Sequence, residues 1–474
     1  MLSQYAYIAM NRFAYGADQK SIKDLSYCKS LVDAQQWLKG QLKPFVLPAS
    51  DWTSEQAFVQ YHQFKKQEEH AKKSTSKMSA DELKLTRKGL QESSRQLAQQ
   101  TALVSINHGQ PLQSRLLDFF SNHFSVTSNN ALLNLIAPTM EVEAIAPNLH
   151  GSFANLLKAV ITHPSMLIYL NNERSIGPNS KLGKKRNAKQ NLNFTGLNEN
   201  LAREILELHT LGVDAGYSQN DVTEMARAIT GWGVGNVKRG EKPGFLFKWQ
   251  AHEPGDRVLL GKVYGESRIA TKTGFKFEYS MQQGLQILSD LANHPNTARH
   301  LSYKLAKHFI ADNPPNVLVD AMTKSWISSD GDIPTVISTL IDHPQSWSLN
   351  SRKLKTPRDF VLSSCRACNQ SSPSPRLFKT LEILGQGLFN AGSPAGYADE
   401  ESEWLGTGAL DARIEWANYF SSVVIKRNKV DPLVVAKTAL GPLMSTQTFT
   451  HIKRAESKQQ SLALLLLSPE FQRR

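Results

Sequence analysis

Apolar residues at helical spacing run through nearly the whole chain, and this periodicity constrains the fold more than any other feature. In residues 21–42, for example, Leu25, Leu31 and Leu38 recur along one helical face. Strand-like sequence is confined to residues 245–264, where GFLFKW and RVLLGKVYG flank a turn at HEPGD. We therefore predict a mainly α fold: a large, irregular helical body with a small β hairpin near residues 245–264.

A short phrase recurs where apolar helical runs end: VITHPSM, LANHPNT, LIDHPQS and LLLSPEF. Proline cannot continue the preceding helix, but its fixed φ suits the first turn of the next one. The phrase therefore predicts helix corners. Three of the four carry a histidine, namely His163, His294 and His343. Clustering of these histidines around a metal is the alternative, and we favour the corners.

Composition narrows the class of protein. Of the 474 residues, 40% are hydrophobic and 20% are charged, which is typical of a folded protein rather than a disordered one. Three cysteines are too few for a disulfide framework. The single CxxC, formed by Cys365 and Cys368, has no second pair or suitably spaced histidines nearby to complete a zinc site. We interpret the pair as structural and predict no metal site.

Membrane and export signals are weak. The longest wholly apolar run, residues 462–467, is far shorter than the roughly 20 residues of a membrane-spanning helix. The start, MLSQYAYIAMNRFAYG, has no basic region followed by an apolar one, as a secretory signal would have. We expect a protein that stays in the cytoplasm, has lost a leader, or is exported as the passenger of a partner.

The chain is basic, with a formal net charge of +13, and such a balance favours acidic partners. The longest basic stretch is GPNSKLGKKRNAKQNLN, residues 177–193, which has no apolar period and is therefore predicted to be an exposed loop. Lys184, Lys185 and Arg186 in this stretch are candidate contacts for an anion or polyanion. A solvated loop without a ligand is the alternative.

The segment NENLAREILELHTLG, residues 198–212, carries the strongest candidate site. At about 100° per residue, Arg203, Glu204 and Glu207 emerge on one side of an α-helix, while His209 leaves on nearly the opposite side. Glu204 and Glu207 can approach each other, which suits acid/base chemistry or a cation, and Arg203 can pair with Glu207. The position of His209 excludes a zincin-type HExxH site. A charged network that only stabilises the helix is the alternative reading.

A second helix follows. SQND places Ser218 as the N-cap with Asp221 three residues later, and the apolar residues of DVTEMARAITGW follow at helical spacing. We therefore predict that residues 198–232 form a helical hairpin.

These residues also support a family assignment. GLNENLAREILELHTLGVDAGYSQNDVTEMARAITGW resembles the central signature of the bacterial domain-of-unknown-function family numbered 1800 (DUF1800). AYIAMNRFAYGA, DFFSNHFSV, FKWQAHEPGDRVLLG, LKTPRDFV and LLLLSPEFQRR resemble further elements of the family in the same order, so the resemblance covers nearly the whole chain. The chain departs from many relatives at Phe120 and Ser121, where they carry Trp-His, and at Glu253, where they often carry Asp.

The resemblance implies a single helical domain over residues 1–474, with a subdivision into residues 1–175, the basic loop 176–197 and residues 198–474. It assigns no activity and no cofactor. Genes of the family often neighbour those of another family, numbered 1501, which resembles sulfatases and alkaline phosphatases. A protein of that family is therefore the implied partner.

Three functions follow as hypotheses, and whether the protein is an enzyme stays open. The first is an accessory or partner protein of the 1501 family member. The second is a hydrolase or transferase acting on a polar or anionic substrate. The third is nucleic-acid binding through the basic stretch. For the enzyme, the candidate catalytic residues are Glu204, Glu207, Arg203 and His123, and the candidate substrate-binding residues are Asn198, Asn200, Asn122, His252 and Lys304.

Overall fold

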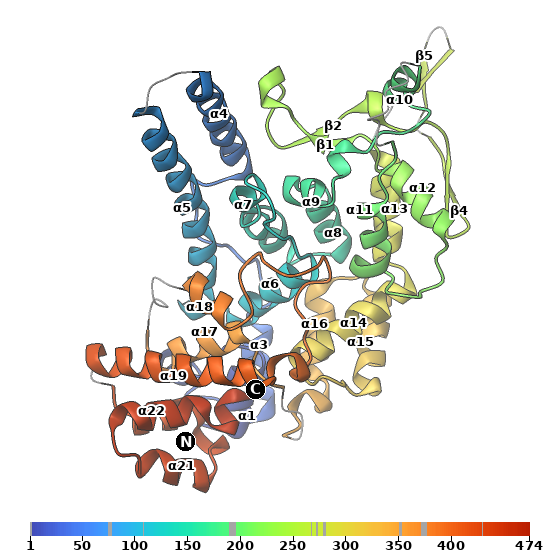
Figure 1. Ribbon diagram of the computed structural model, residues 1–474. Coiled ribbons are helices and arrows are strands. Elements are labelled where there is room, and N and C mark those ends of the chain that lie inside the picture. The colour runs from blue at the N-terminus through green and yellow to red at the C-terminus, as the bar shows by residue number, and fades with distance from the viewer. Residues whose placement is uncertain are drawn as a thin grey trace.

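The computed structural model describes residues 2–73, 78–107, 109–188, 196–266, 268–271, 274–277, 281–349, 353–370, 377–428 and 430–474. These residues build a mainly helical molecule, so the predicted fold class is confirmed (Figure 1). Among them, no helix combines the length and the apolar character that crossing a bilayer requires.

Two of the first six helices are long and lie together on one side of the molecule. The six helices are α1 (Gln4–Arg12), α2 (Gln19–Asp24), α3 (Leu31–Lys39), α4 (Ser54–Lys73), α5 (Met78–Asn107) and α6 (Pro111–His123). Helices α4 and α5 lie side by side and project beyond the rest of the body, whereas α6 lies near its centre and contacts α5 (Figure 1).

Short helical elements fill the middle of the chain. They are α7 (Leu133–Ile136), the π-helical turn η1 (Glu141–Ile145), the 3₁₀ turn η2 (Ala146–Asn148), α8 (Phe153–Ile161), α9 (Pro164–Tyr169), the 3₁₀ turn η3 (Asn172–Arg174), α10 (Lys181–Asn187), α11 (Asn200–Glu204), the π-helical turn η4 (Ile205–His209) and α12 (Gln219–Ala228). Helix α12 begins at the predicted cap: the Ser218 hydroxyl accepts from the Asp221 N–H and the Asp221 carboxylate accepts from the Ser218 N–H. Helix α12 packs against α11, so the predicted helical hairpin is present.

The predicted basic loop is partly wrong. Residues 181–187 form α10, which the Ser180 hydroxyl caps by accepting from the Gly183 N–H at 3.0 Å. Gly183 is buried in α10, and the segment has too few apolar residues for periodicity to show the helix. The remainder of the basic stretch, residues 189–193, lies outside the described residues.

The strands pair differently from the prediction. They are β1 (Trp232–Val234), β2 (Phe245–Phe247), β3 (Arg257–Leu259), β4 (Lys262–Tyr264), β5 (Arg268–Thr271) and β6 (Gly274–Phe277). Strand β2 pairs with β1 and β3 pairs with β4, so the two predicted strands are not partners of each other. RVLLGKVYG forms a hairpin by itself, because Leu260 and Gly261, with φ of +51° and +76°, make a two-residue turn between Leu259 and Lys262.

Helices dominate again after the strands. They are α13 (Gln282–Ala292), α14 (Pro295–Phe309), α15 (Asn316–Ser328), α16 (Ile333–Asp342), α17 (Pro357–Ala367), α18 (Leu377–Ile383), α19 (Thr407–Asn428), α20 (Pro432–Leu440), α21 (Thr446–Lys453), α22 (Lys458–Leu467) and α23 (Pro469–Gln472). The 3₁₀ turns are η5 (Val237–Arg239), η6 (Trp249–Ala251), η7 (Pro344–Trp347), η8 (Glu401–Trp404) and η9 (Gly441–Leu443). The last helices return to α1, where the Tyr7 hydroxyl donates to the Lys437 carbonyl at 3.3 Å (Figure 1).

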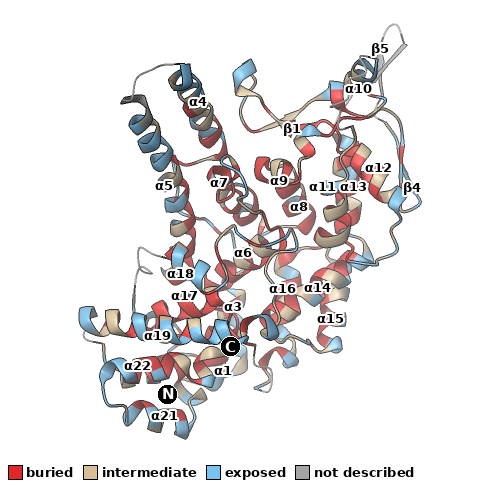
Figure 2. Cartoon of the chain, viewed as in Figure 1, coloured by how far each residue is buried: buried red, intermediate tan, exposed pale blue. Residues whose placement is uncertain are grey.

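Among the described residues, the buried hydrophobic ones group into one large core and two smaller ones. Figure 2 marks the buried residues in red. The large core runs from Ala6 to Trp347 and the second from Phe360 to Phe471, while the third joins Tyr15 to α17 and α18. Cys365 and Cys368 are free and buried in the two smaller cores, and burial raises the pKa of both thiols. This placement matches a structural role for the pair.

The recurring His-Pro phrase forms helix corners, as predicted. His163 caps α9, His294 caps α14 and His343 caps η7. In each corner the histidine Nδ1 accepts the backbone N–H of the residue two positions later, at 3.2, 3.1 and 3.3 Å. Ser468 plays the same part at α23. The imidazole therefore takes over the N-cap role that serine, threonine or aspartate usually fills.

Candidate functional site

The predicted helix 198–211 is only partly α-helical. Helix α11 ends at Glu204 and the π-helical turn η4 continues from Ile205 to His209. The wider turn alters the 100° spacing on which the angular prediction rested. Even so, His209 is fully buried while Glu204 and Glu207 are partly exposed, so the imidazole and the carboxylates do leave on different sides.

The expected pair between Arg203 and Glu207 is wrong. Arg203 reaches Glu199 at 3.6 Å and donates to Gln219 Oε1 at 2.9 Å. Glu199 precedes α11 and Gln219 begins α12, and an arginine can turn toward either end of its helix. Glu207 instead accepts from the Tyr217 hydroxyl at 3.4 Å.

The remaining predicted residues of this helix serve its start and its surface. Burial and the charge of Glu207 raise the pKa of Glu204. Asn198 accepts from the Asn200 N–H at 2.9 Å and donates to the Asn171 carbonyl at 3.3 Å. None of these residues lines the polar cavity described below. Their catalytic and substrate-binding roles stay predictions.

His123 and Lys304 are brought together in the interior. The His123 Nε2 lies 3.2 Å from the His209 carbonyl and its Nδ1 lies 3.1 Å from Lys304 Nζ. Because a carbonyl only accepts, Nε2 must carry the proton and Nδ1 must accept from the lysine. Burial, together with the charge of Lys304, lowers the pKa of His123 well below its usual range. His123 is therefore a neutral, fixed imidazole that holds α6 against η4.

His252 and the basic residues lie elsewhere. The buried His252 Nδ1 lies 2.9 Å from the Thr230 carbonyl, and neighbouring Glu253 accepts from the Asn179 N–H and side-chain amide at 2.8 and 2.6 Å. These contacts fasten the segment before β3 to its surroundings. Lys184 and Lys185 are exposed on α10, and their contact with an anion stays a prediction.

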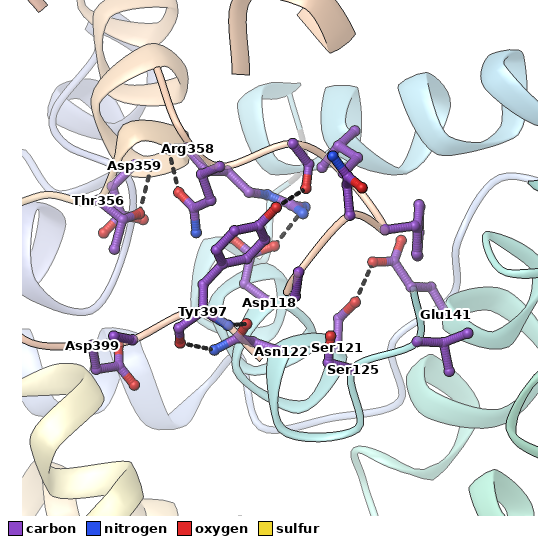
Figure 3. A pocket seen from close by; sticks show the side chains of 18 of the residues that line it. Asp118, Ser121, Asn122, Ser125, Glu141, Thr356, Arg358, Asp359, Tyr397 and Asp399 are labelled. Atoms are coloured by element: carbon purple, nitrogen blue, oxygen red, sulfur yellow. Dashed lines mark hydrogen bonds and ion pairs between the residues drawn. The ribbon is translucent and has the colours of Figure 1, made fainter. Parts of the chain in front are cut away.

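A polar cavity of about 80 Å³ lies beside the C-terminal half of α6 (Figure 3). Its walls come from α6, η1, the start of α17 and the segment between α18 and η8. The lining residues with polar side chains are Asp118, Ser121, Asn122, Ser125, Glu141, His308, Thr356, Arg358, Asp359, Gln386, Asn390, Tyr397 and Asp399. Of the residues predicted for the site, Asn122 alone is among these lining residues.

Charges at the back of the cavity neutralise one another. Arg358 pairs with Asp118 at 2.5 Å, and the Tyr15 hydroxyl donates to the same carboxylate. Burial would lower the pKa of Arg358, but the charge of Asp118 raises it. Asp359 is held by Arg115 at 3.1 and 3.2 Å. Arg474 reaches the same Asp359 carboxylate at 3.2 Å, and these ion pairs fix the floor of the cavity.

Glu141 is a buried acid of the cavity that has no ion-pair partner among the described residues like the one Arg358 gives Asp118, and burial raises the pKa of both acids. Glu141 is 2% exposed, and its Oε1 accepts from the Ser121 hydroxyl at 2.6 Å. Burial raises its pKa, and the charge of Arg358 and the bond from Ser121 offset this only in part. Glu141 can therefore hold a proton at a pH where an exposed glutamate has lost it.

Asp399 behaves in the opposite way. Burial would raise its pKa, but the contact with His308 at 3.3 Å and the charges of Lys353 and Lys304 lower it to about 2. Figure 3 shows Asp399 and Glu141 on opposite sides of Tyr397 and Asn122. The cavity thus joins two acids whose pKa burial raises, Glu141 and the ion-paired Asp118, to one that stays ionised, and acid/base sites commonly combine acids of opposite shift.

Asn122 fastens the outer wall. Its side-chain amide donates to the Tyr397 carbonyl and its Oδ1 accepts from the Tyr397 N–H, both at 2.8 Å (Figure 3). The preceding Gly396 has a φ of +81°, and a Cβ there would collide with the Asn122 carbonyl oxygen. Glycine at this position therefore lets the segment approach α6 closely.

The residues missed by sequence reasoning carried a weak signal. Asp118 and Glu141 are acids within otherwise apolar helical segments, SRLLDFF and APTMEVEAIAP. A buried carboxylate needs a partner, so an acid on an apolar face indicates a buried network. Nothing in the spacing indicates that Arg358, more than 200 residues later, is the partner.

Among the described residues, no group of three histidine, cysteine, aspartate or glutamate side chains is arranged to hold a metal ion.

A family model described as "Protein of unknown function (DUF1800)" matches residues 8–473. No curated protein and no solved structure matches the chain.

Proposed function

The chain belongs to the DUF1800 family of proteins of unknown function, and from that premise we propose that it binds a small, uncharged, hydroxyl-rich ligand in the polar cavity and donates a proton to it from Glu141. The observation that carries the proposal is the pair of acids with opposite pKa shifts, Glu141 raised and Asp399 lowered to about 2, in one cavity. Acid/base sites use such a division of pKa values between two carboxyl groups.

The charges of the lining favour a ligand without negative charge. Four carboxyl groups line the cavity, from Asp118, Glu141, Asp359 and Asp399, against the single guanidinium of Arg358. The guanidinium is already paired with Asp118, so the described lining residues offer an anionic ligand no cation that is free of a carboxylate. The side chains left for the ligand are acceptors, amides and hydroxyls, which suit the hydroxyl groups of a neutral sugar or polyol.

The two acids then take different roles. Protonated Glu141 would give its proton to the leaving oxygen as the bond between that oxygen and the carbon breaks; water, or an acceptor hydroxyl in a transferase, would then bond to the carbon and return a proton to Glu141. Asp399 is too weak a base to remove a proton efficiently at neutral pH, and its fixed negative charge would instead stabilise positive charge that develops on the ligand. A hydrolase or transferase that acts on a neutral glycosidic or similar bond fits these roles best.

The other expectations stay predictions. A partner from the 1501 family and nucleic-acid binding through α10 draw no support from the cavity. The earlier catalytic set, centred on Glu204 and Glu207, is the competing location for an active site.

Matched glutamate variants distinguish the two locations. We would measure binding of neutral monosaccharides and polyols by calorimetry, and release of nitrophenol from nitrophenyl glycosides, for the wild type, Glu141→Gln and Glu207→Gln. The proposal expects the activity of Glu141→Gln to be at least about 100-fold below that of the wild type, in line with general-acid catalysis. The activity of Glu207→Gln should equal that of the wild type. Loss in Glu207→Gln alone, or the absence of binding and activity with every probe, would overturn the proposal.

A further inference from the structure

A second, larger cavity of about 260 Å³ lies next to the polar cavity. Helix α5 contributes Gln91, Ser94 and Arg95 to its wall, and α18 contributes Phe378 and Glu382. The two cavities share four consecutive lining residues, 387–390. We call the larger cavity the outer cavity and residues 387–390 the strap, because the strap walls both cavities.

The strap is held mainly through its backbone. The Phe389 carbonyl accepts from the Ser128 N–H at 2.8 Å, and the Gly387 carbonyl accepts from the Tyr397 hydroxyl at 2.8 Å. Phe389 has a φ of +52°, in the left-handed region, where an aromatic residue costs on the order of 1 kcal/mol. The surrounding contacts therefore hold the strap in a conformation that its sequence does not favour.

The strap is also short. Four residues span at most about 14 Å even when fully extended. A ligand of a few linked rings can therefore lie against both of its sides. Two cavities that share four lining residues adjoin closely enough for one extended ligand to contact both.

The lining of the outer cavity carries fewer acids than that of the polar cavity and, like it, has amide and hydroxyl side chains. It offers the amides of Gln91 and Asn134, the rings of Phe378 and Phe389, and one cation and one anion, Arg95 and Glu382, whose charges balance. Rings that face polar groups suit a sugar, because a sugar has apolar faces and hydroxylated edges.

We propose that the outer cavity is a second subsite of the same binding site. The first unit of a linear, neutral oligosaccharide would occupy the polar cavity, and the outer cavity would take the neighbouring unit. This inference rests on the proposed function. The ligand is then a chain of sugars rather than a single sugar, and Gln91 and Arg95 bind its second unit.

The test measures how binding affinity depends on the length of the oligosaccharide and on the side chains of α5 that line the outer cavity. The probes are neutral gluco-, manno- and N-acetylglucosamine oligosaccharides of one to four units, with binding measured by calorimetry. The double variant Gln91→Ala with Arg95→Ala changes the outer cavity. The matched control is Lys88→Ala with Gln96→Ala, which removes one basic and one amide side chain from exposed positions of the same helix outside both linings.

The inference expects the dimer or trimer to bind at least tenfold more tightly than the monomer, and the outer variant to lose that gain while its monomer affinity and the control stay unchanged. Equal affinity for monomer and oligomer, with binding that still depends on Glu141, would overturn the second subsite and leave the proposed function standing. Equal losses of oligosaccharide affinity in the outer variant and in the control would also overturn the second subsite. Absence of binding to every probe would overturn both.

Discussion

Replacement of the buried Lys355 by methionine should remove a specific part of the pH dependence of stability. Lys355 is 2% exposed, and its ammonium lies 4.0 Å from the centre of the Phe471 ring. Burial lowers its pKa from 10.5 to about 7, with the charge of Asp359 acting against the shift and those of Arg115 and Arg413 adding to it. At about 1.4 kcal/mol per pKa unit, this is a cost on the order of 5 kcal/mol for burying the charged form.

The aromatic ring offsets part of that cost. A desolvated cation over a ring face gains about 2 kcal/mol, which is less than half of the burial cost, so burial decides the direction of the shift. Because the pKa of Lys355 is lower in the folded state than in the unfolded state, the unfolded state binds more protons between about pH 7 and pH 10.5. Stability should therefore rise with pH across this window, by up to about 1.4 kcal/mol per pH unit.

The assay is urea denaturation of the wild type and Lys355→Met at pH 6.5 and 9.5. Methionine has a similar length and no charge, so the variant should be more stable than the wild type at pH 6.5, and this advantage should shrink by about 1 to 3 kcal/mol at pH 9.5. The control is Lys324→Met at an exposed position of α15, which should leave the pH dependence unchanged. An advantage that is equal at both pH values, or a control that behaves like Lys355→Met, would refute the reasoning.

Three further changes test other parts of the structure. Asp399→Asn should lower the free energy of unfolding by about 2 kcal/mol at pH 7. The pKa of Asp399 is about 2 in the folded state against 3.8, so the carboxylate contributes stability that is present above pH 3.8 and lost as the pH falls through 2. Denaturation at pH 7 and at pH 2.5 should show the difference between wild type and variant shrink at the lower pH. His163→Ala removes the cap of α9 and the 3.0 Å contact with Glu143, and should lower the free energy of unfolding, measured by denaturation, by about 2 kcal/mol. A loss below about 0.5 kcal/mol would mean that the corner needs no imidazole. Arg203→Gln should change stability by less than about 0.5 kcal/mol, because its pair with Glu199 is exposed; a larger loss would restore the organising role expected for this arginine.

Much of the local structure could be predicted because its causes lie within a few residues. The Ser218 cap, the His-Pro corners and the start of α12 depend on a side chain and a backbone N–H two or three positions apart. The same locality explains the errors. Helix α10 has too few apolar residues to show a period, and pairing of β2 with β1 rather than β3 depends on residues far from the predicted turn.

The candidate site could be predicted only in fragments. The acidic helix 198–211 was found because its charges lie close together in sequence, yet its residues do not line the polar cavity. Asn122 was found through the family resemblance, whereas Glu141 and Asp399 were missed. Glu141 carried only the weak signal of an acid in a largely apolar segment, and no residue type or spacing distinguishes Asp399 from the other carboxylates of the chain.

The sequence by itself determined the helical class, the family and the positions where helices begin and turn, because these follow from periodicity, caps and proline over short distances. The tertiary structure alone decided which charges are buried together. Arg358 meets Asp118 across 240 positions of the chain, and Asp399 meets His308 across 91. A pKa shift depends on distance through space and on the exclusion of water, and both are set only once the packed helices have closed around the cavity.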